Sequence, residues 1–118
     1  MPRHDDTVAL RDMLDYARTA RRVVCGRRRQ DLDTDELLRL ALTRAIEVIG
    51  EAAARVSAMG REKHPKIPWA QIIGVRNRLI HAYNTIGLDI LWQIATLDLP
   101  PLVEQLEAIL ADEPKSGS

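Results

Sequence analysis

The sequence predicts an all-α fold, an antiparallel up-and-down bundle of four or five helices. Aromatic residues make up 3% of the 118 residues and Phe is absent, so Leu, Ile, Val and Ala must build the core. Such a core favours packed helices over a sheet, and apolar residues recur at steps of three and four along most of the chain. The length suits a single domain. We expect this domain to span residues 1–112, followed by a flexible polar tail at residues 113–118.

Two long helices are predicted in the first half of the chain. Residues 5–24 carry an apolar residue at every third or fourth position, and Gly26 is a plausible stop signal. The second helix is expected to begin near Asp33 or Thr34, where acidic residues fall in its first turn. Its broad apolar stripe continues to Gly60, which we expect to end it.

Gly50 interrupts the apolar stripe of this second helix. A glycine inside a helix costs about 1 kcal/mol relative to alanine, because it gains no packing and loses more conformational freedom on folding. A glycine on a core-facing position therefore predicts that another helix packs closely against it.

Shorter helices are predicted in the second half. The segment 64–69 holds two prolines and is expected to be an extended connector. A proline suits the first turn of the next helix, which is expected over residues 68–82. A further helix is expected over residues 88–97. The prolines at positions 100–101 should then break or kink the chain before a last helix that ends near Leu110.

Composition excludes several classes of function. Cys25 is the single cysteine, which rules out an internal disulfide framework and a cysteine-based zinc site. The four aromatic residues are too few for a base-stacking platform. No apolar run approaches the roughly 20 residues that span a bilayer, and no signal-peptide pattern is present. We therefore expect a cytoplasmic protein without a membrane partner.

Charge is unevenly distributed along the chain. The formal net charge is zero, but residues 1–81 carry a balance of +5 and residues 82–118 a balance of −5. Arg27, Arg28 and Arg29 form the densest basic cluster. They are either a solvated helix end and loop or contacts that steer an RNA backbone.

The helix expected over residues 68–82 breaks the pattern of its own apolar face. On a helical wheel its apolar residues cover an arc of about 160°, and Arg76 lies in the middle of that arc. Asn77 and His81 lie at its edge, one turn apart. A buried arginine is costly unless it is paired. Either Arg76 pairs with Glu47 or Glu51 of the preceding helix, or it belongs to a functional site.

The string RNRLIHAY, residues 76–83, resembles the Arg-x4-His-x-Tyr signature of HepT-type toxins, which belong to the HEPN superfamily. The similarity extends over nearly the whole chain in order. Segments outside the signature that resemble the family are residues 46–53 (IEVIGEAA), 67–69 (IPW), 72–74 (IIG), 88–89 (LD), Trp92 and 98–100 (DLP).

This resemblance implies a HEPN-like helical bundle that forms a homodimer and cleaves RNA without a metal or another cofactor. By position, Arg76, Asn77 and His81 would form the active site at the dimer interface. Tyr83 would be the residue that a cognate minimal nucleotidyltransferase, the antitoxin, adenylylates to silence the toxin. The pair would constitute a type VII-like toxin–antitoxin system.

The residue types suit this chemistry. Metal-independent RNA cleavage needs a base for the 2′-hydroxyl proton, an acid for the leaving 5′-oxygen and a cation for the phosphoryl oxygens. Histidine serves as acid or base because its free pKa is near 6.5, and arginine can grip two oxygens at once. A two-fold dimer would supply both copies of His81 and Arg76. The alternatives are a catalytically inactive HEPN subunit that binds nucleotide or RNA beside a nucleotidyltransferase, and a plain dimerisation module.

Overall fold

A computed structural model describes residues 4–82 and 87–112 of the chain, and only the backbone of residues 4–5 and 80–82. The predicted tail at residues 113–118 lies outside the described residues. Within those ranges the chain is helical and contains no strand. The segments in order are α1 (His4–Val24), α2 (Asp31–Thr34), α3 (Glu36–Arg55), α4 (Ala58–Lys63), α5 (Trp69–Ala82), α6 (Leu88–Gln93), the π-helical segment η2 (Ile94–Asp98) and α7 (Leu99–Asp112).

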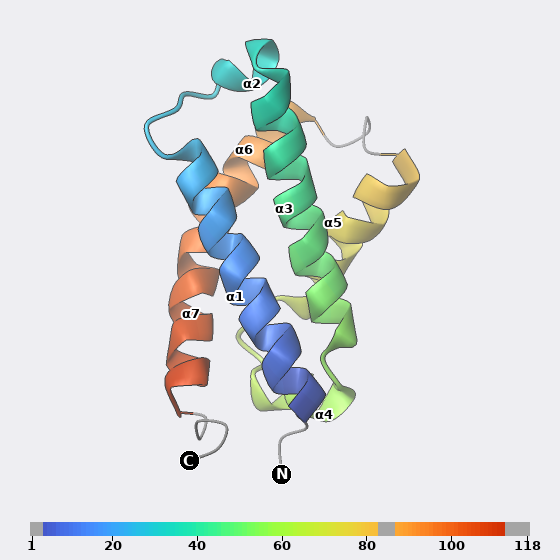
Figure 1. The fold of residues 1–118 in the computed structure, drawn as a ribbon. Helices are drawn as coiled ribbons and strands as arrows, with labels where there is room; N and C mark the ends of the chain where they lie inside the picture. The colour runs from blue at the N-terminus through green and yellow to red at the C-terminus, as the bar shows by residue number, and fades with distance from the viewer. Residues whose placement is uncertain (1–3, 83–86, 113–118) are drawn as a thin grey trace.

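The long helices run alternately up and down, as the sequence predicts (Figure 1). α1 lies between α3 and α7 and packs against both. Met13 of α1, Leu42 of α3 and Leu106 of α7 are completely buried, so the apolar stripes of the three helices meet in one core. The predicted first helix is confirmed to within one residue, and Gly26 follows it with a φ of 75°, a conformation that glycine adopts without strain.

α5 occupies an outer position in the bundle. It packs mainly against α3 and lies on the side of that helix away from α1 and α7 (Figure 1). The prediction of a helix over residues 68–82 is confirmed, since Trp69 begins it and the Pro68 carbonyl accepts its first backbone hydrogen bond from Ile72 N–H at 3.1 Å. Because α5 rests on one neighbour, much of its surface is not part of the main core.

The predicted start of the second helix at Asp33 or Thr34 is wrong. Both residues belong to the separate short helix α2, and α3 begins after Asp35. Asp35 has an extended backbone, and its side chain accepts a hydrogen bond from Leu38 N–H at 3.0 Å. This backbone hydrogen bond is the main reason that the pKa of Asp35 lies below its ordinary value. The N-cap therefore separates two helices that apolar spacing alone merges.

The predicted end at Gly60 is also wrong. α3 ends at Arg55, and Ser57 begins a new helix by accepting a hydrogen bond from Gly60 N–H at 3.0 Å. The buried carboxylate of Asp6 accepts two hydrogen bonds from Ser57, one from its N–H at 2.8 Å and one from its hydroxyl at 2.6 Å. A contact to the distant N-terminus therefore fixes this break.

The predicted break at Pro100 and Pro101 takes a different form. The chain passes from α6 through η2 into α7 without leaving a helical conformation, and both prolines lie in the first turn of α7. Leu99 N–H bonds to the carbonyl of Ile94, five residues earlier. The wider π turn accommodates the proline rings and the missing N–H donors, so the helix is interrupted in its hydrogen bonding but continues.

Candidate functional site

Arg76 lies where α5 crosses α3, directly over Gly50. A Cβ placed on Gly50 would lie 2.1 Å from Arg76 Cβ, 2.9 Å from Arg76 Cγ and 3.1 Å from the backbone oxygen of Ile72. No side chain fits into that space, so the glycine allows the two helices to approach and places the stem of Arg76 against the α3 backbone. The close packing that Gly50 predicts is confirmed.

The guanidinium of Arg76 is only partly satisfied. The side chain is half-buried, and Nη1 donates a hydrogen bond to Asn77 Oδ1 at 2.9 Å. Nε is buried and has no hydrogen-bond partner in the described part of the chain. A buried donor without a partner costs about 1–3 kcal/mol, and native proteins rarely retain one without a reason. An anion bound at the guanidinium would supply the missing acceptor.

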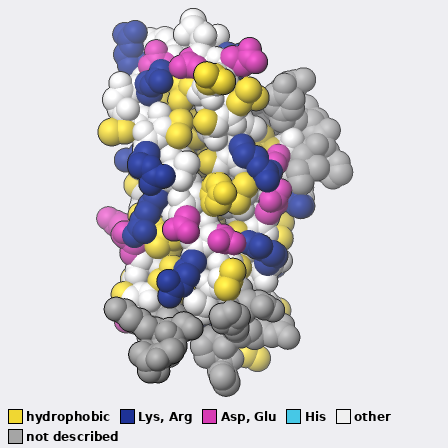
Figure 2. Space-filling view, in the orientation of Figure 1, with side chains coloured by type: hydrophobic (Ala, Val, Ile, Leu, Met, Phe, Trp, Pro, Cys, Tyr) yellow, Lys and Arg dark blue, Asp and Glu magenta, His cyan; other side chains and the backbone are white. Residues whose placement is uncertain are grey.

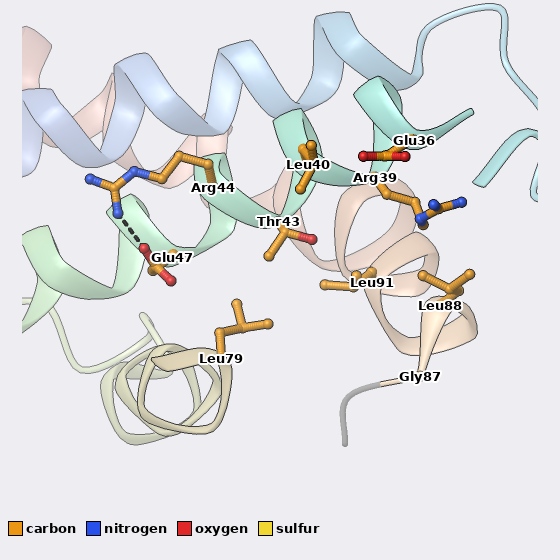
Figure 3. A pocket seen from close by; sticks show the side chains of 10 residues that line it. All are labelled: Glu36, Arg39, Leu40, Thr43, Arg44, Glu47, Leu79, Gly87, Leu88 and Leu91. Carbon is orange, nitrogen blue, oxygen red and sulfur yellow. Dashed lines mark hydrogen bonds and ion pairs between the residues drawn. The ribbon is translucent and has the colours of Figure 1, made fainter. Parts of the chain in front are cut away.

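Glu47 and Glu51 of α3 pair with a different arginine, Arg44. Arg44 Nη1 bonds to the Glu47 carboxylate (Figure 3) and lies 3.3 Å from Glu51 Oε1. The hydrogen bond with Glu47 is the main reason that the pKa of Arg44 lies above its ordinary value. Among the described residues, Arg76 has no carboxylate within ion-pair distance. Internal pairing of Arg76 with Glu47 or Glu51 is therefore not what the structure contains.

Arg44 was not identified as a site residue from the sequence, although its spacing from Glu47 and Glu51 was informative. It precedes Glu47 by three residues and Glu51 by seven, positions that share one face of a helix. This spacing could have indicated that the two carboxylates already have a partner on their own helix.

The structure brings part of the predicted motif together. Arg76 and Asn77 are adjacent on α5 and hydrogen-bonded, and Asn77 is exposed. His81 belongs to the last turn of α5, one helical turn after Asn77. The His81 side chain and the whole of Tyr83 lie outside the described residues.

The basic cluster after α1 is largely engaged in contacts within the chain. Arg27 Nη1 pairs with Asp35 Oδ2 at 3.1 Å. Arg29 pairs with Asp89 at the start of α6 and with Asp33 Oδ1 at 3.1 Å. Its pKa is raised, chiefly by the hydrogen bond with Asp89. These pairs fasten the connector to α2, α3 and α6.

Whether this cluster contacts an RNA backbone depends on how many of its guanidinium groups are not already paired within the chain. The backbone N–H of Arg28 donates to Asp31 at 2.8 Å, which leaves its guanidinium outside that contact. Figure 2 shows Lys and Arg interspersed with Asp and Glu on the face in view, not gathered by sign. The role of Arg27, Arg28 and Arg29 as RNA contacts stays a prediction.

A groove adjoins the motif on the side of α6. α3, α6 and Leu79 of α5 line this open groove, which has a volume of about 640 Å³ (Figure 3). In that view Leu79 and the Arg44–Glu47 pair lie toward one end, and Leu88 lies toward the other. The volume is within the range of ligand pockets. Leu79 follows Arg76 by one turn of α5, so the groove begins next to the motif. Its lining residues are Glu36, Arg39, Leu40, Thr43, Arg44, Glu47, Leu79, Gly87, Leu88 and Leu91.

The described residues offer neither a metal-binding cluster nor a membrane span. Among the side chains that the structure describes, no three from His, Cys, Asp or Glu are grouped so that they could hold a metal ion. None of the helices in residues 4–82 and 87–112 combines the length and apolar character that a membrane span requires.

The fold and site define a class of protein, a small all-helical bundle with an Arg-Asn motif and a following histidine on its outer helix. The chain belongs to the HepT-like ribonuclease family, because the family model described as "Ribonuclease HepT-like" matches residues 13–109. The resemblance of the sequence to HepT-type proteins is thereby confirmed.

Relatives from bacteria and archaea agree with this family. "Putative RNase TTE0752" of Caldanaerobacter subterraneus subsp. tengcongensis is 38% identical over 84 residues, which cover 71% of this chain and 75% of the relative. "Putative RNase MJ1216" of Methanocaldococcus jannaschii is 30% identical over 95% of this chain and 93% of its own length. "Probable ribonuclease HepT" of Thermococcus cleftensis is 34% identical over 68% of this chain and 73% of its own length. No solved structure matches the chain.

Proposed function

We propose that this chain is a metal-independent endoribonuclease and the toxin of a toxin–antitoxin pair. The observation that carries the proposal is the Arg76 guanidinium, which is half-buried, lacks a partner for Nε and is not neutralised by the carboxylates of α3. Membership of the HepT-like ribonuclease family supports RNA as the substrate. Arg76 binds the scissile phosphate and stabilises the charge that develops on it.

The proposed reaction is an internal transesterification. His81 takes the proton of the 2′-hydroxyl, whose oxygen attacks the phosphorus while the bond from phosphorus to the 5′-oxygen breaks. A second histidine protonates that leaving oxygen. The products are a 2′,3′-cyclic phosphate and a 5′-hydroxyl end. Asn77 accepts a hydrogen bond from Arg76 through Oδ1, so its amide nitrogen is left to donate to a phosphate oxygen or to orient the imidazole.

The second histidine comes from a second copy of the chain. Each chain offers one histidine in the motif, and an acid and a base are both needed. A two-fold homodimer that places the two α5 helices face to face supplies both His81 side chains and both Arg76 side chains. The outer position of α5, which rests mainly on α3, supports this arrangement.

The nuclease assay uses purified chain and a labelled RNA, with and without EDTA. We expect cleavage that survives EDTA, a loss of about 10²–10⁴-fold in His81→Ala and of about 10²–10³-fold in Arg76→Gln. Arg55→Gln is the matched control, because it removes an arginine whose ion-pair partner is Asp12 of α1 and not a residue of α5. Full activity of His81→Ala, or loss of activity with EDTA, would contradict the mechanism. RNA binding without cleavage would favour the inactive-subunit alternative.

We also propose that a cognate minimal nucleotidyltransferase, present in the same cytoplasm, silences the toxin by adenylylating Tyr83. Added AMP would place a phosphate near Arg76 and His81, where it would occupy the site and repel RNA. Mass spectrometry after co-expression of the two proteins should detect the mass of AMP on the peptide that holds Tyr83, and Tyr83→Phe should remain unmodified. An unmodified Tyr83 in the wild-type chain would refute this part of the proposal.

A further inference from the structure

Glu47 and Glu51 flank the point where Arg76 crosses α3. The stem of Arg76 lies on Gly50. Glu51 is the next residue, and Glu47 is three residues earlier on the same side of the helix. Residues three or four apart on a helix have Cβ atoms about 5–6 Å apart, so Glu47 lies one turn from both Gly50 and Glu51 and both acidic side chains begin close to this crossing.

A carboxylate on Arg76 would compete with a phosphate for the same guanidinium. The structure contains no such pair among the described residues, and Arg44 Nη1 engages both Glu47 and Glu51 instead. We propose that Arg44 is a positioning residue: it holds Glu47 and Glu51 away from Arg76 and so keeps the Arg76 guanidinium available to an anionic ligand. This inference rests on the proposed role of Arg76 as the phosphate-binding group.

Stability alone does not account for this arrangement. The Arg44 side chain is 61% exposed, whereas those of Glu47 and Glu51 are 20% and 34% exposed. Ion pairs at such exposed arginines contribute little to folding. The two carboxylates are less exposed and lie beside the α3–α5 crossing, so the direction in which they point decides the charge that an RNA phosphate meets there.

The decisive variants remove Arg44 alone or together with the acids that it holds. We expect Arg44→Gln to lower kcat/KM for RNA by up to about fivefold, because released carboxylates pair with Arg76 and reduce the fraction of chains whose Arg76 is free. The triple variant Arg44→Gln, Glu47→Gln, Glu51→Gln should recover activity to within about twofold of wild type. Arg55→Gln on the same helix is the matched control and should leave activity unchanged.

Recovery of activity in the triple variant would show that Arg44 acts by positioning the carboxylates. If Arg44 had only a structural role, Arg44→Gln and the triple variant would lose the same ion pairs and would be equally impaired. Thermal melting of each variant checks that it is folded. Full activity of Arg44→Gln, or a triple variant as impaired as Arg44→Gln, would overturn the proposal.

A second readout does not depend on cleavage. The NMR resonance of Arg76 Nε–H, assigned by its loss in Arg76→Gln, should shift in Arg44→Gln and return toward its wild-type position in the triple variant. An unchanged resonance in Arg44→Gln would overturn the proposal even if the wild-type chain cleaves RNA. A chain that shows the shift but never cleaves RNA would instead refute the proposed function and leave the positioning of the carboxylates established.

Discussion

Gly50→Ala tests the closeness of α3 and α5 directly. The added Cβ would lie 2.1 Å from Arg76 Cβ, about 1.3 Å inside the 3.4 Å at which ordinary contact begins. Both clashing groups are fixed to helix backbones, so α5 must move away from α3. Overpacking of this kind costs about 1–3 kcal/mol, and the higher helix propensity of alanine offsets about 1 kcal/mol. We expect a net loss of up to about 2 kcal/mol, or a melting temperature lower by up to roughly 8 °C.

The same displacement should affect RNA cleavage more than stability. A misplacement of about 1 Å at a catalytic group can cost roughly 100-fold in rate. The rate of RNA cleavage should therefore fall by more than the loss of folded protein alone would cause. Gly74→Ala is the matched control for stability, because no described atom of another element lies within 4 Å of its added Cβ. It should stabilise the chain by up to about 1 kcal/mol. A Gly50→Ala protein with wild-type stability and wild-type cleavage would refute the close crossing.

Three further predictions concern the bundle itself. Leu42→Ala, at a completely buried position, should cost about 2–5 kcal/mol in urea denaturation, whereas Leu37→Ala on the same helix, 78% exposed, should change stability by less than about 0.5 kcal/mol; equal losses would contradict the core. Asp6→Ala should cost roughly 1.5–3 kcal/mol in the same assay, because Ser57 loses both acceptors. Because the folded pKa of Asp35 is lowered, its charge stabilises the fold above the unfolded pKa of about 3.9. The advantage of wild type over Asp35→Asn in thermal melts should therefore vanish as the pH falls through the lowered pKa, and a gap independent of pH would count against it.

The helices could be predicted from the sequence where local pattern decides them. The first helix and the helix that carries Arg76 have the expected bounds, because apolar spacing and a nearby Gly or Pro mark their ends. The end at Gly60 failed because the real break depends on Asp6, which meets Ser57 across 51 residues of sequence. Apolar spacing contains no information about such a distant hydrogen-bond partner.

The close crossing of α3 and α5 could be predicted from the sequence, but the pairing of the charged residues beside it could not. Gly50 indicated the crossing, and the stem of Arg76 lies on it. The sequence left open whether Glu47 or Glu51 pairs with Arg76, because spacing alone does not distinguish a partner on the same helix from one on a neighbouring helix. In the structure both acids pair with Arg44, which lies on their own helix.

The position of α5 separates the stability of this fold from its site. The core formed by α1, α3 and α7 buries most of the large aliphatic residues, whereas α5 rests mainly on α3 and carries the partly satisfied Arg76. The buried, unpaired Nε of Arg76 therefore lies on the outer helix, α5, and not in the core formed by α1, α3 and α7. It also follows that Gly50 serves the site more than the core, because any side chain there would lift Arg76 off α3 and away from the face that Arg44, Glu47 and Glu51 define. Substitutions inside the core should thus change stability with little effect on the geometry of the site, whereas substitutions at the α3–α5 crossing should change both.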